Sequence, residues 1–335
     1  MASLSEIAQH AGVSKSTVSL VMNNRPYVSQ EMRDRVLRAA AELSSTTKPR
    51  AVNAQHSPNV LLIHPLSMGS QQVFRELLQG VRTAVVNEGR GQLTPAAHDP
   101  PLKPEHATSA LLHDPALRPD GVIVMGAGEH DPIIAEAQQE GLPCVLLARQ
   151  HAPEGTSCVG MDNASGARTA VEHLLGHGHT RIALVGGDES FDYTELRIAG
   201  YREAMEAAGL EPEIHLGSGD TATRALISAH PDRRTFPTGI FFINDEHAAR
   251  GMPVLAEHGF RVPTDASVVG FDDTDNATQC SPPLTSIRVP RFLIGRLAGR
   301  TVLDHIRFPE LERLTLLLRT ELISRESVAT LTRRA

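Results

Sequence analysis

Cysteine and long apolar runs are both scarce in this sequence of 335 residues. Its three cysteines, Cys144, Cys158 and Cys280, have no paired spacing, so we expect neither a disulfide framework nor a cysteine metal site. No apolar stretch is long enough to cross a membrane, and no basic segment followed by an apolar run opens the chain. The sequence therefore predicts a cytoplasmic protein of about two domains, without export or membrane insertion.

The chain also lacks an overall positive charge. Its net charge is −7 at pH 7, which by itself argues against binding to nucleic acid. The charge is uneven, however: residues 1–50 hold seven basic and four acidic side chains, so this segment carries +3 and the remainder −10. A small basic head on an acidic body fits a protein that contacts phosphates with one end only.

The first 45 residues predict three short helices. Ser3 and Glu6 form a capping box, and apolar residues recur at helical spacing as far as Ala11. Gly12 favours a helix end, and Ser14 is placed as the next N-cap. A third helix is expected after Ser29. Two short helices joined by a tight turn that contains glycine are typical of a helix-turn-helix.

The second of these helices has a polar outer face. Its inner face is formed by Val18, Val21 and Met22, so Lys15, Ser16, Ser19 and Leu20 point outward. A helix presented to the major groove reads base edges with its N-terminal residues, and lysine can donate to guanine acceptors. An exposed helix of a small bundle that contacts nothing is the alternative.

The segment Ala8–Asn24, AQHAGVSKSTVSLVMNN, closely resembles the head of the lactose-repressor/galactose-repressor (LacI/GalR) family. The resemblance implies a regulator that binds double-stranded operator DNA. One departure is Leu20, where the family often has arginine, so we expect an apolar contact such as a thymine methyl at that position. The residues implied to contact DNA in the head are Ser14, Lys15, Ser16, Thr17, Ser19, Leu20, Asn23 and Ser29.

Residues 46–59 form a linker rich in Ser, Thr, Pro and Asn. In the family, this stretch contains a short hinge helix that inserts a leucine into the minor groove. His56 falls about where that leucine would be, and we predict a weaker helix and a poorer wedge. Val52 could take over the role in a shifted register.

From residue 60 onward, short apolar strands alternate with amphipathic helices. Alternation of this kind predicts an α/β fold with parallel sheets covered on both faces, and its length suits two lobes. The expected strands are 60–63, 122–125, 145–147, 182–185, 240–243, 268–271 and 314–318. The expected helices are 73–88, 132–140, 164–175, 194–208, 221–229, 245–258 and 291–305.

The resemblance to the family continues through this body, in segments such as LRIAGYREAMEAAG (196–209) and VVGFDDTDNATQCSPPLTSIRVP (268–290). It implies a core like that of periplasmic sugar-binding proteins, which binds a small-molecule effector between two lobes and forms a homodimer or a tetramer. We therefore expect a helix-turn-helix head at 1–45, a hinge at 46–59 and the core at 60–335. The N-lobe is expected at about 60–160 and 290–318, and the C-lobe at about 161–288 and 319–335.

Candidate effector residues lie at the carboxyl ends of strands, where ligands bind in such sheets. Arg197 stands in the family's Arg-x-x-Gly-Tyr pattern, which implies a guanidinium that holds ligand oxygens; an ordinary surface arginine is the alternative. Asn244, Asp245 and Asp272 follow two strands and would accept from sugar hydroxyls. Helix capping is the alternative for Asp245, and turn formation for Asp272.

Several pocket features of the family are absent. The chain has no tryptophan, on which sugars commonly stack, and Ala148-Arg149 stands where relatives often carry aspartate. Arg149, Arg197 and His64 could instead favour an anionic ligand. The expected effector is a sugar, a sugar phosphate or a nucleoside-like metabolite.

Other kinds of site have weak support. His173, His177 and His179 have a spacing that metal sites use, but the family has a Gly-His pair in this loop without a metal role. Residues 126–128 and 186–190 are glycine-containing loops that match no nucleotide-binding motif. We expect no metal, no cofactor and no enzyme activity. The main prediction is a ligand-responsive repressor, and the alternative is a solute-binding module whose DNA-binding role has decayed.

Overall fold

The computed structural model describes residues 4–22, 28–29, 32–33, 35–39, 57–65, 71–98, 112, 117–126, 131–189 and 191–331. They belong to two units, which divide near residue 56. We call the described residues up to 39 the head and those from 57 onward the core. The predicted DNA contacts Asn23, Val52 and His56 lie outside the described residues.

The head contains the predicted helix-turn-helix. Helix α1 (Leu4–Ala11) ends at Gly12, whose φ of 63° is the left-handed conformation that glycine adopts without a steric penalty. Helix α2 (Lys15–Met22) follows, and residues 32–33 and 35–39 are helical as well. The apolar faces meet in a small core, which contains Ile7, Ala8, Ala11, Val18, Val21, Val36 and Ala39.

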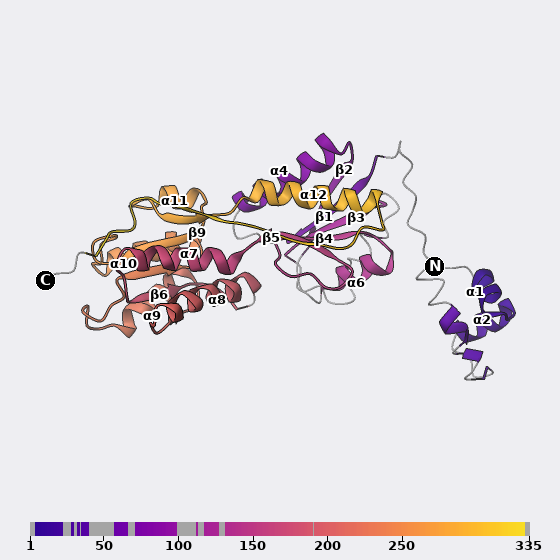
Figure 1. Cartoon of the computed structure of the whole chain (residues 1–335), viewed down its shortest axis with the longest axis horizontal. Coiled ribbons are helices and arrows are strands. Elements are labelled where there is room, and N and C mark those ends of the chain that lie inside the picture. The colour runs from indigo at the N-terminus through magenta and orange to yellow at the C-terminus, as the bar shows by residue number, and fades with distance from the viewer. Residues whose placement is uncertain are drawn as a thin grey trace. The chain divides into compact units, whose positions relative to one another are not determined.

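The core contains two six-stranded sheets, and we call the sheets with their helices the N-lobe and the C-lobe (Figure 1). The N-lobe sheet has the order β11-β5-β4-β3-β1-β2, and the C-lobe sheet has the equivalent order β12-β10-β9-β8-β6-β7. All pairs are parallel except β10 with β12. The predicted α/β fold with parallel sheets is confirmed.

The elements of the N-lobe are β1 (Asn59–Pro65), α4 (Gln71–Arg82), the π-helix η1 (Thr83–Glu88), β2 (Gln92–His98), β3 (Gly121–Met125), α6 (Pro132–Gln139), β4 (Cys144–Leu147), β5 (Ser157–Met161), α12 (Arg291–Arg307) and β11 (Thr315–Leu318). The predicted helix 73–88 is thus an α-helix that widens into a π-helix. Helices α4 and α12 pack closely, and glycine at the contact makes this possible. A Cβ atom at Gly80 would clash with the carbonyl of Phe292, and one at Gly295 would clash with the carbonyl of Leu77.

The elements of the C-lobe are α7 (Asn163–Gly176), β6 (Ile182–Val185), α8 (Asp192–Ala207), β7 (Glu213–His215), α9 (Gly219–Ala229), β8 (Gly239–Phe242), α10 (Asp245–Glu257), β9 (Ser267–Asp272), α11 (Asp275–Gln279), β10 (Thr285–Arg288) and β12 (Glu321–Ile323). Helices α7 and α8 pack together, and so do α9 and α10. The chain passes between the sheets three times, after β5, after β10 and after β11.

Five strands were not predicted: β2, β5, β7, β10 and β12. Three of them lie at sheet edges, where one side of the strand needs no partner and polar residues are tolerated. Strand β2 even contains Pro95, which sheets accept at an edge. Strands β7 and β12 have only three residues each, too few to produce a periodic pattern.

Candidate DNA-binding and effector sites

Helix α2 presents the side chains that the sequence places on its outer face. Val18 and Val21 are buried, whereas Lys15 and Ser16 are exposed and Leu20 has 39% of its surface accessible. The Ser14 hydroxyl accepts from the Thr17 backbone N–H at 3.1 Å and lies 2.8 Å from the Thr17 hydroxyl. Ser14 is therefore the helix N-cap, as predicted.

Ser29 holds the start of the third helix in the same way. Its hydroxyl accepts from the Met32 N–H at 3.4 Å, and its carbonyl accepts from the Arg33 N–H at 2.9 Å.

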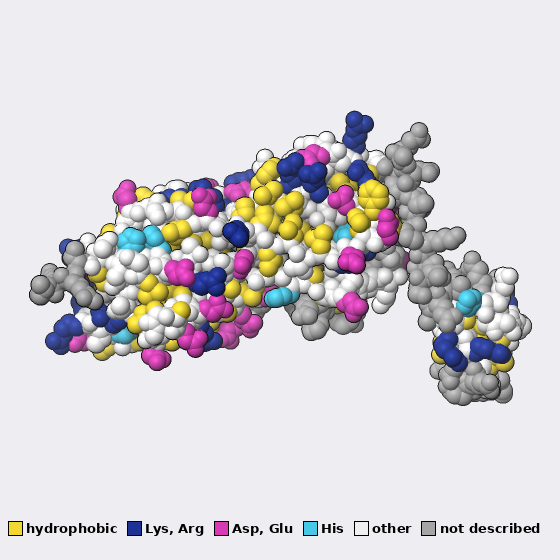
Figure 2. All heavy atoms as spheres, in the orientation of Figure 1, with side chains coloured by type: hydrophobic (Ala, Val, Ile, Leu, Met, Phe, Trp, Pro, Cys, Tyr) yellow, Lys and Arg dark blue, Asp and Glu magenta, His cyan; other side chains and the backbone are white. Residues whose placement is uncertain are grey.

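On the face of the core shown in Figure 2, arginine and lysine side chains are intermixed with aspartate and glutamate. Among the described residues on that face, there is thus no basic surface of one sign that could follow a phosphate backbone.

Arg197 lies on α8 in the C-lobe and is only 3% exposed. Its Nε donates to the Asn163 side chain at 3.0 Å, Nη1 to the Ile243 carbonyl at 2.7 Å, and Nη2 to the Asp272 carboxylate at 3.1 Å. The Phe271 ring lies 3.6 Å from the guanidinium carbon. Arginine has five N–H donors, so described residues accept from three of them and the other two have no partner within that part of the chain.

Asp272 and Asp273 form a left-handed turn at the end of β9, with φ values of 99° and 50°. Such values are rare for residues other than glycine, so the surroundings must hold the turn in place. The Asp273 carboxylate pairs with Arg288 at 2.7 Å and with Arg325 at 2.6 Å. This turn places the Asp272 carboxylate against Arg197.

Asp245 is fully buried at the start of α10. One of its carboxylate oxygens accepts from the Ser286 hydroxyl at 2.6 Å, and the other accepts from the Thr274 N–H at 2.6 Å and the Thr274 hydroxyl at 3.2 Å. Its pKa is raised to about 7, chiefly by burial and also by the Asp272 carboxylate, against the opposing effect of these hydrogen bonds. A Cβ atom at Gly270 would clash with the carboxylate, so β9 can pass beside it only with glycine there.

Asn244 is the N-cap of α10. Its side-chain oxygen accepts from the His247 N–H at 3.0 Å and lies 2.8 Å from His247 Nδ1. The structure thus brings Asn244, Asp245, Arg197 and Asp272 together at the carboxyl ends of β8 and β9.

The other two predicted effector residues lie in the N-lobe. Arg149 follows β4, and its Nη1 pairs at 3.0 Å with Asp192 of α8, so this ion pair joins the two lobes. The Nε of Arg149 is buried and has no hydrogen-bond partner among the described residues. His64 is half-buried at the end of β1, and its ring centroid lies 4.5 Å from that of Phe74.

Two aromatic residues beside Arg197 were missed by the sequence analysis. The rings of Phe191 and Tyr193 stack at 5.4 Å, and the Tyr193 ring centroid lies 4.9 Å from the Arg197 guanidinium carbon. Phe191 is 51% exposed. Tyr193 stands four residues before Arg197, a spacing that shares a helix face and could have revealed it. The chain has no tryptophan, but these two rings offer another aromatic surface next to Arg197.

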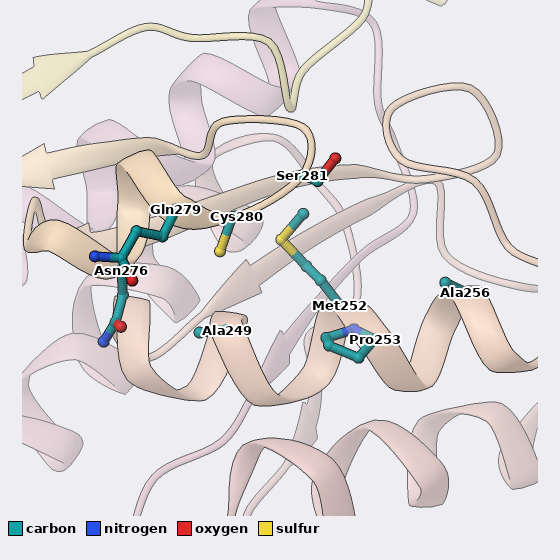
Figure 3. Close-up of a pocket in the computed structure, with 8 residues that line it drawn as sticks. All are labelled: Ala249, Met252, Pro253, Ala256, Asn276, Gln279, Cys280 and Ser281. Carbon is teal, nitrogen blue, oxygen red and sulfur yellow. The ribbon is translucent and has the colours of Figure 1, made fainter.

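A groove of mixed polarity lies apart from these residues, between α10 and the segment around α11 (Figure 3). Met252 points from α10 toward Cys280 and Ser281. The groove is lined by Ala249, Met252, Pro253, Ala256, Asn276, Gln279, Cys280 and Ser281. None of the predicted effector residues lines it.

The histidines at 173–179 do not converge on one point. His179 lies within hydrogen-bond distance of Thr238 and of the Ala329 carbonyl, whereas His173 and His177 contact each other. In the described part of the chain, no three His, Cys, Asp or Glu side chains are grouped to hold a metal ion.

Comparison with known proteins identifies the family. Residues 3–47 match the family model described as bacterial regulatory proteins, lacI family, and residues 171–328 match a periplasmic binding protein-like domain. The chain is 32% identical to the HTH-type transcriptional regulator CelR of Thermobifida fusca, across 97% of each chain. It belongs to the lacI family of bacterial regulatory proteins.

Further relatives agree with this assignment. The HTH-type transcriptional repressor CytR of Escherichia coli (strain K12) is 32% identical, across 98% of this chain and 97% of the relative. A structure described as a CelR–cellobiose complex superposes with a TM-score of 0.71 at 30% identity, across 98% of this chain and all of the other. This lacI-family chain is a ligand-responsive, DNA-binding transcription regulator. The described helices include none long and apolar enough to cross a membrane.

Proposed function

We propose that this chain is a repressor whose effector is an uncharged sugar or nucleoside, bound between the two lobes beside Arg197. One observation carries the choice of ligand class: both candidate arginines already have a carboxylate partner. Arg197 is paired with Asp272, and Arg149 with Asp192. A phosphate at either arginine would lie beside a carboxylate that already neutralises the guanidinium, whereas a hydroxyl brings no negative charge and can accept from the N–H groups that remain on Arg197.

The charges around Tyr193 support the same choice. Burial raises the pKa of its phenol, and Asp272, Glu246 and Asp188 add to the rise against the opposing effect of Arg197. The carboxylates of Asp272, Glu246 and Asp188 thus act on the same point as Arg197 and oppose its attraction for an anion. The stacked rings of Phe191 and Tyr193 offer an apolar surface to the face of a sugar or a base.

The relatives give the proposal its context. The CelR structure is described as a cellobiose complex, and another regulator, 25% identical with a TM-score of 0.68, is described with bound ribose. A relative 30% identical is named the ribose operon repressor of Escherichia coli (strain K12). We propose that this protein likewise acts in the cytoplasm on the expression of an operon for carbohydrate or nucleoside use.

Matched pairs of neutral and phosphorylated ligands test the ligand class. We expect ribose, cellobiose or cytidine to raise the melting temperature, and ribose 5-phosphate or cytidine monophosphate to have no effect. A ligand at 100 times its dissociation constant adds about 2.7 kcal/mol of stability, which a thermal-shift assay detects easily. Stabilisation by the phosphorylated member of a pair alone would refute the proposal.

For the DNA-binding role, we propose that α2 of each subunit of a homodimer enters the major groove of a near-palindromic operator. Lys15, Ser16 and Leu20 would contact base edges, with Ser14, Thr17, Ser19, Asn23 and Ser29 in supporting contacts. A gel shift with the DNA upstream of its own gene tests this role. Failure to bind that DNA at low salt, with the core folded and ligand-responsive, would favour a solute-binding module instead.

Asp245 calls for a different role from the one the sequence suggested. Because its two oxygens already accept three hydrogen bonds inside the C-lobe, we propose that it supports the turn at 272–274 and that Asp272, Arg197, Asn244, Arg149 and His64 face the effector.

A further inference from the structure

One buried arginine joins helices of the N-lobe to a turn of the C-lobe. Arg291, the first residue of α12, has a side chain that is 5% exposed. Its Nε donates to the Glu76 carboxylate on α4 at 2.8 Å. Nη1 donates to the Asp272 carbonyl, and Nη2 donates to the Asp273 carbonyl at 3.5 Å. A single guanidinium therefore holds α4, α12 and the end of β9.

A second bridge lies beside the first. The Asp275 backbone N–H of the C-lobe donates to the side-chain oxygen of Gln72 on α4 at 2.7 Å. The amide nitrogen of Gln72 donates to the other oxygen of Glu76 at 2.8 Å. Gln72 and Glu76 are four residues apart and share a helix face, so both bridges start from the first turns of α4.

The turn that these residues hold is the one that carries the effector site. Asp272 turns its carbonyl toward Arg291 and its carboxylate toward Arg197. On the C-lobe side, the Asp273 N–H donates to the Ser286 hydroxyl at 3.1 Å, and that hydroxyl donates to Asp245. One residue thus contacts the candidate effector arginine with its side chain and the N-lobe with its backbone.

We propose that Gln72, Glu76 and Arg291 form an inter-lobe clasp on residues 272–275, which couples the effector site to helix α4. The guanidinium of Arg291 is planar, and its N–H donors have fixed directions. If the Asp272 backbone rotates, Arg291 can keep its contact to the Asp272 carbonyl only by giving up the contact to Glu76. A ligand that draws the Asp272 carboxylate into a new position therefore shifts the balance between a closed and an open clasp. The role of the clasp in signalling rests on the proposed effector site, but the coupling between residues 272–275 and helix α4 does not.

Amide hydrogen exchange of the ligand-free protein tests the coupling. We expect Glu76→Ala and Arg291→Lys, both in the N-lobe, to raise exchange at least threefold in residues 271–279 of the C-lobe. Lysine keeps the charge of Arg291, but its donors all sit on one nitrogen, so it cannot reproduce three contacts that start from three separate nitrogens. Coupling is reciprocal, so Ser286→Ala in the C-lobe is expected to raise exchange in residues 71–82 of α4.

A matched control distinguishes the clasp from general loosening of the helix pair. Glu88 and Arg296 form another ion pair between η1 and α12, at 2.8 Å, which contacts no residue of the 272–275 turn. Glu88→Ala is expected to leave exchange at 271–279 unchanged. Unchanged exchange there in both Glu76→Ala and Arg291→Lys, or an equal rise in Glu88→Ala, would overturn the clasp.

Ribose and cellobiose then serve as probes of signalling. In the wild type, the sugar that binds is expected to alter exchange in both 271–279 and 71–82, and in Glu76→Ala only in 271–279. If neither sugar nor cytidine binds, the proposed ligand class is wrong, while the ligand-free measurement still decides the clasp.

Discussion

Asp245 offers a sharp test of the C-lobe architecture, because its buried carboxyl titrates near neutral pH. Its pKa is about 7 in the folded protein, mainly through burial, against an ordinary value of 3.8. Between these pH values the folded state keeps a proton that the unfolded chain has released. The stability that comes from this group is therefore full below pH 3.8 and is lost as the pH rises through 7.

The size of the effect follows from the same two values. One pKa unit corresponds to about 1.36 kcal/mol, and most of the difference is expressed above pH 5, so we expect a loss of about 2–3 kcal/mol between pH 5 and pH 8. Asp245→Asn cannot ionise. Its amide nitrogen can donate to the Ser286 hydroxyl, while its oxygen accepts from Thr274, so the local packing is retained.

Urea denaturation of both proteins at several pH values from 5 to 8 measures this loss. We expect the free energy of unfolding of the wild type to fall relative to that of Asp245→Asn across this range. Burial lowers the pKa of histidines such as His179 and His247, but these groups are present in both proteins, so they cancel in the difference. Parallel pH profiles for the two proteins would refute the reasoning.

Two further predictions concern the head and the proposed effector site. Lys15→Ala should weaken operator binding by roughly 1–3 kcal/mol and relax the sequence preference at one base position in each half-site, which a binding-site selection assay measures. Equal weakening on all sequences would make Lys15 a phosphate contact instead. Arg197→Ala should abolish the ligand-induced thermal shift, and an unchanged ligand affinity would remove Arg197 from the site. Because the substitution leaves a partly buried Asp272 unpaired, it should also destabilise the core by roughly 3–5 kcal/mol in urea denaturation.

Local signals account for the parts of the structure that the sequence predicted well. Gly12 marks the turn of the helix-turn-helix by its left-handed backbone, and Ser14 marks it by its hydroxyl, which accepts from the Thr17 N–H. Both effects act within a few residues of the chain, so the sequence reveals them. The strands near the sheet centres are short, continuous apolar runs, which indicate strands buried on both faces. Asp245 illustrates the opposite case. Its hydrogen-bond partners Thr274 and Ser286 lie 29 and 41 residues away, so its burial could not be predicted from the residues around it.

Arg197 shows why the charge of a site is harder to predict than its position. The Arg-x-x-Gly-Tyr pattern indicates where the guanidinium lies, but its partners Asn163, Ile243 and Asp272 are 34, 46 and 75 residues away. Read alone, two arginines near a cleft suggest an anionic ligand. Once each is paired with a carboxylate, a phosphate must either displace that carboxylate or bind beside it against like-charge repulsion. A hydroxyl meets neither obstacle, because it is uncharged and can accept from the N–H groups that Asp272 leaves unused. The choice between a sugar and a sugar phosphate thus depends on contacts that only the folded chain creates.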